Sequence, residues 1–264
     1  MIKFFRRIRQ KLLTESRFGS YLLYAIGEIV LVVIGILIAL QINNWNEEQK
    51  QQRLEQEYYC RLSEDVTQDK EQMSILLGLA QERLEASNQS VRLLLDENSK
   101  KVEVGQLISL SLKAVYSDFQ PNNSAYEDLK SGANLNIISD KSVIKALNHY
   151  FNRVEELKSI IMVNGKYAVD LSFRHTDNFA NGTNQASIAN GRFSKGLDED
   201  LKKAFPIDED ELLKPEMRER LLGESLEYVS VNTRQVELYS KLLDEIIELE
   251  GLLGQKCERS SVTE

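Results

Sequence analysis

The chain has 264 residues, and its 33 basic and 41 acidic side chains give a formal net charge of −8. Residues 1–42 carry a net charge of +4 and the other 222 residues carry −12, which is typical of a membrane-anchored protein and excludes a general nucleic-acid binder, because phosphate contacts need clustered Lys and Arg on the working domain. Three prolines and 13 glycines without a G-x-y period exclude a collagen-like chain and disfavour a β-sandwich.

Residues 1–20 form the first predicted element, a cytoplasmic basic amphipathic stub. Phe4 or Phe5, Ile8 and Leu12 recur at helical spacing, with the basic side chains largely on other faces. A basic residue near an anionic leaflet contributes on the order of 1 kcal/mol, so we expect the stub to lie on inner-membrane lipid. A plain topogenic signal explains the same charges, and the stub is too short to fold as an output domain.

Residues 21–42 are the predicted transmembrane helix. They contain one charged residue, and at 1.5 Å per residue they would span roughly 33 Å. The competing interpretation is a cleaved signal peptide, but Ala39 and the residues after it lack the small-residue cleavage pattern. Because the basic residues precede this segment, the positive-inside rule places the N-terminus in the cytoplasm and exports residues 43–264.

Glu28 is the charged residue within the apolar segment. An ionisable group in a span is a functional hypothesis, although Glu28 lies close enough to the interface to snorkel or to pair with Arg17. At 100° per residue, Gly35 and Ala39 lie within 20° of Glu28, and two small residues at this spacing let helix backbones approach closely. This face therefore predicts homo-oligomerisation through the transmembrane helix.

The exported body begins with a long predicted helix over residues 45–95, where apolar side chains recur at spacings of three, four and seven without a proline. We expect this helix to continue the membrane helix, since Asn43 and Asn44 are the only turn signal between them. A turn at residues 96–101 leads into a short apolar segment at 107–115.

The second half of the body contains further helical patterns. Ser124 is predicted to cap a short helix that ends at Gly132 in a left-handed conformation. Asp140 opens a longer helix, and Pro215 is placed in the first turn of a final long helix. Residues 178–194 carry two Asn-Gly pairs and form the longest predicted loop. We therefore expect an all-α fold, in which an N-terminal transmembrane helix continues into an exported antiparallel helical bundle.

The two cysteines, Cys60 and Cys257, lie early in the first long helix and just after the last one. In an antiparallel bundle both would be at the membrane-proximal end, so a disulfide is geometrically plausible. Two unpaired thiols are an equal alternative. No C-x-x-C occurs, so the sequence lacks the motif for a zinc site of this type and for thioredoxin-type redox chemistry.

Catalytic and metal-binding motifs are missing from the sequence. His149 and His175 have no Glu or His at metal-ligand spacing, and His149 beside two aromatic residues is typical of helix packing. We find no P-loop, no G-x-S-x-G, no G-x-G-x-x-G and no H-E-x-x-H. The sequence therefore predicts no catalytic, cofactor or metal residue. Acid and base groups can also converge from distant segments without any motif, so an enzyme is kept as a hypothesis.

The run FFRRIRQKLL followed by YLLYAIGEIVLVVIGILIALQINNWNEE resembles the N-terminal signature of an uncharacterised family of single-pass bacterial membrane proteins, common in Bacteroidota. The later stretch SAYEDLKSGANLNIISDKSVIKAL is similar to that family's second recurring segment. The resemblance implies an N-terminal membrane anchor and an exported helical domain. Together with the orientation above, we expect the anchor in the inner membrane and the body in the periplasm. It implies no activity, cofactor or catalytic residue.

These observations favour a membrane-anchored helical module that acts by protein interaction or scaffolding, with a partner that the sequence does not identify. The alternative is an extracytoplasmic sensor domain that binds a small ligand, in a pocket near residues 120–135 or under the 178–194 loop. An enzyme is the third hypothesis, because a fold alone does not fix a function.

Overall fold

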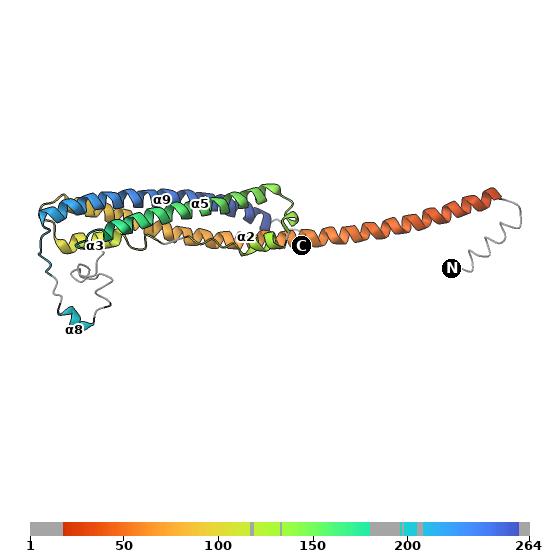
Figure 1. Ribbon diagram of the computed structural model, residues 1–264. Helices are drawn as coiled ribbons and strands as arrows, with labels where there is room; N and C mark the ends of the chain where they lie inside the picture. The colour runs from red at the N-terminus through yellow and green to blue at the C-terminus, as the bar shows by residue number, and fades with distance from the viewer. Residues whose placement is uncertain are drawn as a thin grey trace. The chain divides into compact units, whose positions relative to one another are not determined.

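The computed structural model describes residues 18–116, 119–132, 134–179, 196, 198–204 and 208–258. Over these residues the structure is all-α, which confirms the predicted fold class (Figure 1). The chain divides into two compact units, residues 1–56 and 57–264. Most of the predicted cytoplasmic stub and of the predicted 178–194 loop lies outside the described residues.

Helix α2 runs from Phe18 to Leu94, a length of 77 residues. It passes through Asn43 and Asn44 without a break, so the apolar segment and the helix predicted after it are one helix. In the described part of the chain it is the one helix long and apolar enough to cross a membrane. The mean hydropathy of its most apolar window is 2.6, and no residue in that window is buried.

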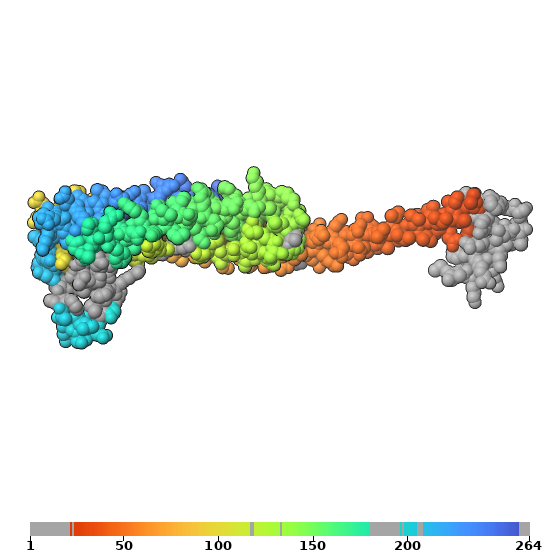
Figure 2. Space-filling view, in the orientation of Figure 1, coloured from red at the N-terminus to blue at the C-terminus, as the bar shows by residue number. Residues whose placement is uncertain are grey.

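The second unit contains three long helices: residues 57–94 of α2, α5 (Lys141–Phe173) and α9 (Pro215–Glu258). In Figure 2 the green atoms of α5 lie along the blue atoms of α9. Each helix turns an apolar stripe inward, as the spacing of three and four predicts. The helix that begins after Asp140 is long. Its apolar residues continue at buried positions up to Leu171.

Contacts between side chains give the helix directions. Cys60 near the start of this unit joins Cys257 near its end, so α2 and α9 run antiparallel. Asp140 pairs with Lys256 at 2.6 Å, so α5 also runs antiparallel to α9. Helices α2 and α5 therefore run parallel to each other, and α9 runs antiparallel to both.

Parallel helices need a return connection, and the shorter elements supply it. They are α3 (Lys101–Ser111), α4 (Ser124–Ser131) and the 3-10 helix η1 (Asn134–Ile137), and α8 (Glu199–Lys202) follows α5. Helix α4 packs its buried residues Ala125 and Leu129 into the same apolar core as the three long helices. The connection therefore forms part of the core.

Two details of the predicted helix ends are wrong and two are confirmed. The N-cap of α4 is Asn123, and the Ser124 hydroxyl instead donates to Asp65 of α2. Gly132 ends α4 with φ of −75°, which is not left-handed. Asp140 is the N-cap of α5 and accepts from the Ser142 N–H at 2.9 Å, and Pro215 is the first residue of α9. Tertiary contacts displaced only the local signals at α4.

The second unit has two apolar cores. The first contains Tyr58 to Ala80 of α2 with parts of α4, α5 and α9, and the second surrounds Leu94, Ile108 and Tyr228. Between them the buried side chains are polar: Arg83, Ser87, Ser90, Ser111, Asn232 and Gln235. A buried polar layer thus separates two stretches of apolar packing.

Candidate functional site

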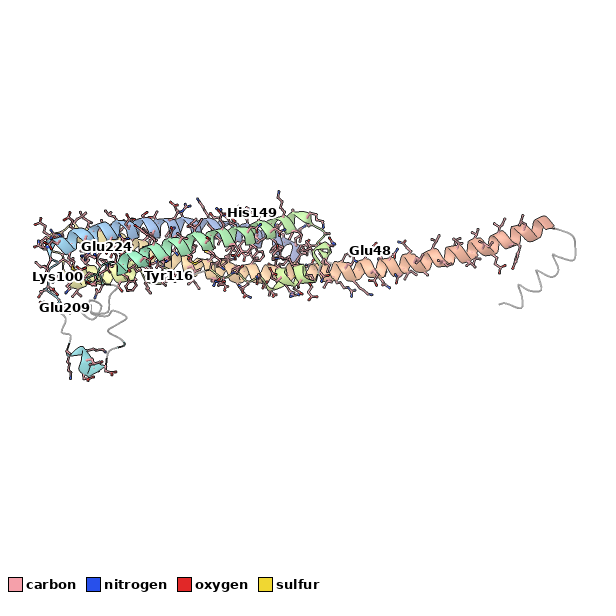
Figure 3. The ribbon with its side chains drawn as sticks, in the orientation of Figure 1. Glu48, Lys100, Tyr116, His149, Glu209 and Glu224 are labelled. Atoms are coloured by element: carbon pink, nitrogen blue, oxygen red, sulfur yellow. A yellow bond between two sulfur atoms is a disulfide. The ribbon has the colours of Figure 1, made fainter. Side chains whose placement is uncertain are left out.

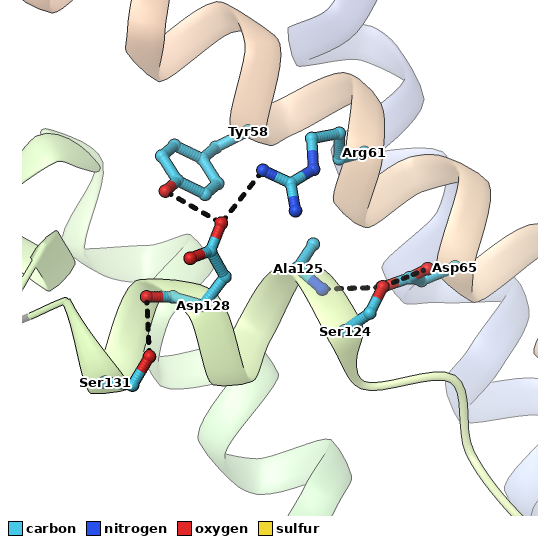
Figure 4. A network of polar contacts seen from close by, with 7 residues as sticks. All are labelled: Tyr58, Arg61, Asp65, Ser124, Ala125, Asp128 and Ser131. Atoms are coloured by element: carbon cyan, nitrogen blue, oxygen red, sulfur yellow. Dashed lines mark hydrogen bonds and ion pairs between the residues drawn. The ribbon is translucent and has the colours of Figure 1, made fainter.

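The first polar cluster joins α2 to α4 (Figure 4). Tyr58 and Arg61 of α2 both donate to the Asp128 carboxylate of α4, at 3.1 and 3.0 Å. One turn later, Asp65 accepts from the Ser124 hydroxyl and from the Ala125 N–H, the latter at 3.0 Å. These side chains occupy one face of α2 and hold the first and last turns of α4 against it.

Asp69 continues the same face into the core and is fully buried. Its carboxylate accepts from the N–H and the side-chain amide of Asn122, at 2.7 and 2.9 Å, and from the Tyr150 hydroxyl at 2.7 Å. Burial raises the pKa of Asp69, and the three donors oppose that effect. The carboxylate thus accepts from three protein donors, while the nearby Asp65 charge adds to the rise in its pKa. This arrangement indicates a structural anchor for the segment before α4.

We expect Asp69→Asn to lower the free energy of unfolding by about 2 kcal/mol, because an amide presents one oxygen to three donors and sets its own NH2 against another. The midpoint of urea unfolding measures this loss. Glu64→Gln is the matched control, since Glu64 is exposed on the same helix. An equal loss in both variants would contradict the anchoring role of Asp69.

The second cluster is the polar layer around Arg83, whose side chain is 1% exposed. The guanidinium donates to Asn232 Oδ1 at 3.2 Å, to Gln235 Oε1 at 2.9 Å and to the Lys113 carbonyl at 3.2 Å. All three acceptors are neutral. This buried cation is therefore stabilised by two side-chain amide oxygens of α9 and by a backbone carbonyl of the turn after α3. Gly165 of α5 faces the same turn, because a Cβ there would lie 3.0 Å from the Val115 carbonyl oxygen.

The third cluster lies at the other end of the unit from the disulfide and is centred on Glu224 of α9, labelled in Figure 3. Glu224 is 5% exposed, and its carboxylate accepts from the side-chain amide of Asn178, which follows α5. Arg220 lies 3.5 Å from Glu224 and 2.7 Å from Asp177. Burial raises the pKa of Glu224, while Arg220 and Asn178 oppose that rise.

A cavity of about 280 Å³ lies beside this third cluster. Arg220 and Asp177 belong to both. The other described residues that line the cavity come from α3, from the extended segment before α9 and from the first turn of α9: Lys101, Glu211, Leu212, Leu213, Lys214, Glu216 and Met217. The third cluster and this cavity form the candidate functional site, because they combine a concave surface with a perturbed buried carboxyl group.

The raised pKa of Glu224 predicts a pH dependence. The folded state binds this proton more tightly than the unfolded chain, so the group favours folding below its ordinary pKa and that contribution is lost as the pH rises through the folded value. We expect the stability of Glu224→Gln relative to the unmodified protein to rise from pH 4 to pH 7, measured by urea unfolding. Glu219→Gln, at an exposed position of the same helix, is the matched control; an equal rise in both variants would contradict the prediction.

The structure places the residues singled out in the sequence as follows. Cys60 and Cys257 form a disulfide with their Cα atoms 4.9 Å apart. Glu28, Gly35 and Ala39 lie in the first unit, and a Cβ built at Gly35 would have no atom within 4 Å, so homo-oligomerisation stays a prediction. In the described part of the chain, no three His, Cys, Asp or Glu residues are placed to hold a metal ion.

The sequence reasoning missed Glu224, Asn178 and Arg220. Asn178 and Glu224 are 46 residues apart, so no local spacing connects them. One signal was present: Glu224 occupies a core position of the apolar stripe of α9, between the buried residues Leu221 and Tyr228. A charged residue inside such a stripe indicates a partner across the bundle.

The chain matches the model of DUF6090, a family of unknown function, over residues 28–171, which is more than half of its length. The chain belongs to this family. No curated protein and no solved structure matches it.

The DUF6090 match covers part of the sites described above. It includes the carboxylates of α2 and the α4 segment that they hold, and it includes Arg83. It ends before Asn178 and before α9, so the Glu224 cluster lies outside it, as do the Asn232 and Gln235 partners of Arg83. The predicted membership of a family of unknown function is confirmed. This family supplies no activity for the chain.

Proposed function

We propose that the protein is a single-pass membrane-anchored module whose helical body, residues 43–264, lies outside the cytoplasm and acts by protein interaction or scaffolding. The observation that carries this proposal is the exposed apolar segment of α2, because a helix that is apolar on all faces is stable only in an apolar surrounding. The proposed location is the bacterial inner membrane, with residues 1–20 on the cytoplasmic side and residues 21–42 within inner-membrane lipid.

The disulfide supports the export of the body. Cys60 and Cys257 are bonded, and disulfides persist in oxidising compartments such as the periplasm and are rare in the cytoplasm. The basic residues before the apolar segment support the same orientation. Two independent features, one covalent and one electrostatic, thus favour a periplasmic body.

Labelling of the cysteines after mild reduction tests this topology. We expect a membrane-impermeant maleimide to label Cys60 and Cys257 in spheroplasts without lysis. Ser16→Cys in a variant with both native cysteines replaced by serine is the cytoplasmic reference, and we expect its labelling only after lysis. Labelling of the native pair that requires lysis would overturn the proposed orientation.

The interaction that we propose first is self-association through Glu28, Gly35 and Ala39. Beyond the apolar segment, residues 43–56 are polar on nearly all faces, and none of them is buried. A helix of this composition gains little from packing within one chain, so a second copy alongside it would bury surface that the first unit leaves exposed.

We expect Gly35→Leu to reduce self-association in a membrane two-hybrid assay about tenfold, because a large side chain separates helices that approach through small residues. Gly27→Leu is the matched control: this glycine lies in the same helix, 100° from Glu28, and also has no neighbour within 4 Å of an added Cβ. Equal signals for the two variants would remove this face from the proposal.

A second candidate function is the binding of a small ligand. The observation that favours it is the cavity beside Glu224, which lies next to Asp177, at the start of the predicted 178–194 loop. The other predicted position, around residues 120–135, stays a prediction. Ligand binding is proposed here at the cavity beside Glu224.

A further inference from the structure

Leu212, one of the residues that line the cavity beside Glu224, forms an isolated antiparallel bridge with Lys100. The segment before α9 is extended and pairs with the residues before α3: the Lys101 N–H donates to the Glu211 carbonyl at 2.8 Å, and the Leu213 N–H donates to the Ser99 carbonyl at 3.1 Å. In this antiparallel pattern the bridged residues, Lys100 and Leu212, turn their own N–H and C=O groups away from each other. Leu212 therefore offers a donor and an acceptor on the side that does not face Ser99.

No hydrogen bond to the N–H or C=O of Leu212 is formed by the described residues. Leu212 lines the cavity and is 49% exposed. An unpaired strand edge of this kind binds extended peptide-like groups through main-chain hydrogen bonds. This edge is the first element of a recognition site.

The charges in the cavity supply the second element. Lys101 is paired with Glu211 at 2.9 Å, and Arg220 is paired with Asp177 at 2.7 Å. Lys214 and Glu216 also line the cavity, and their side chains form no ion pair among the described residues. Among the described lining residues, Lys214 thus supplies an ammonium and Glu216 a carboxylate without an ion-pair partner, two residues apart in sequence.

The apolar surface supplies the third element. Leu213 and Met217 are the other apolar residues of the lining, and Leu213 is 4% exposed. A volume of about 280 Å³ is close to the lower end of the roughly 300–1,000 Å³ that ligand pockets have, so the cavity suits a small ligand. Ligand cavities of this type bind an apolar body and orient it with a few polar groups.

We infer that this cavity binds a zwitterionic α-amino acid or a short peptide with an apolar side chain. Lys214 and the Leu212 N–H match the ligand's carboxylate, Glu216 and the Leu212 C=O match its ammonium group, and Leu213 and Met217 match its side chain. This inference rests on the second candidate function, ligand binding. It adds the chemical class of the ligand.

Isothermal titration of the full-length protein in detergent tests the inference with four probes: leucine, leucyl-leucine, N-acetyl-leucine and leucinamide. We expect leucine or leucyl-leucine to bind saturably, and the stronger of the two distinguishes a free amino acid from a peptide. We expect the two blocked probes to bind at least about tenfold more weakly, since each lacks one of the charges that are recognised.

Two substitutions in the cavity test the residues. We expect Lys214→Met and Glu216→Gln each to raise the Kd for the zwitterion about tenfold. Lys202→Met and Glu199→Gln are matched controls, because these residues are the same types on exposed α8 and do not line the cavity. All four positions are on the surface or half-buried, and an unchanged Tm verifies that each variant folds.

Three results would overturn the inference in different ways. If a blocked probe binds as tightly as leucine, the cavity binds ligands but the zwitterion class is wrong. If Lys214→Met and Glu216→Gln leave the Kd of leucine unchanged, leucine binds elsewhere. If none of the four probes binds, both the inference and ligand binding as the second function fail, while the membrane-anchored interaction module is unaffected.

Discussion

Loss of the Cys60–Cys257 disulfide is expected to lower the free energy of unfolding of the second unit by about 5 kcal/mol in the chain-entropy model. The two cysteines are 197 residues apart, so the bond closes nearly the whole unit into one loop. A cross-link of that span removes more entropy from the unfolded chain than any short loop in the protein. In a unit of this size, the loss corresponds to a Tm decrease of roughly 10–20 °C.

The double variant Cys60→Ser, Cys257→Ser measures this effect by thermal and urea unfolding in detergent. Dithiothreitol supplies the control: it is expected to lower the Tm of the unmodified protein to that of the double variant and to leave the double variant unchanged. A double variant with an unchanged Tm would show that the noncovalent contacts at this end hold α2 to α9 without the bond.

The ion pairs at this end are few and partly exposed, although Leu62, Leu249 and Leu253 also lie there in the first apolar core. Lys70 pairs with Glu250 at 2.6 Å between α2 and α9, and Lys256 pairs with Asp140 at the start of α5. Exposed and half-exposed ion pairs contribute about 0–1 kcal/mol each. The disulfide is therefore the dominant single interaction that fixes the two ends of the unit together.

The sequence predicts the long helices because their apolar spacing is local. The stripes of α2, α5 and α9 recur every three or four residues, and Asp140 and Pro215 mark helix starts by their own chemistry. The cap of α4 could not be predicted in this way. Ser124 has the residue type of an N-cap, but Asp65, 59 residues earlier, accepts its hydroxyl, and a contact so distant leaves no trace in local spacing.

The candidate site shows the same limit. Glu224, Asn178 and the cavity residues come from three segments, and only the fold brings them together. The disulfide was an open alternative because the sequence gives the ends of two helices and not the distance between them. Arg83 is intermediate: it interrupts the apolar stripe of α2 between Ala80 and Leu94, which indicates a polar partner without identifying it.

Replacement of Arg83 by methionine is expected to destabilise the second unit by about 3 kcal/mol. Methionine fills much of the same space, so the loss comes mainly from the acceptors that Arg83 leaves behind: Asn232, Gln235 and the Lys113 carbonyl. A buried acceptor without a donor costs about 1–3 kcal/mol, and relief from burying the guanidinium charge offsets part of that sum.

Arg92→Met is the matched control, because Arg92 lies on the same helix with its side chain 69% exposed. Surface substitutions of this kind change stability by about 0.5 kcal/mol or less. Equal urea midpoints for the two variants would contradict a stabilising role of Arg83. Arg83→Lys adds a second test: lysine keeps the charge but lacks the planar fork, so we expect it to lose stability as well.

The polar layer around Arg83 lies between two apolar cores, so it also affects how α9 is aligned along α2. If α9 slid by one turn against α2, Arg83 would keep only one of Asn232 and Gln235, which lie about one turn apart, and would meet apolar residues near Val231 or Leu238 in place of the other. A buried cation that loses an acceptor is costly. The polar layer therefore fixes the register of α9, as single buried polar residues do in coiled coils. We expect Arg83→Met to broaden the unfolding transition as well as to shift it, because two apolar cores that merge permit more than one register.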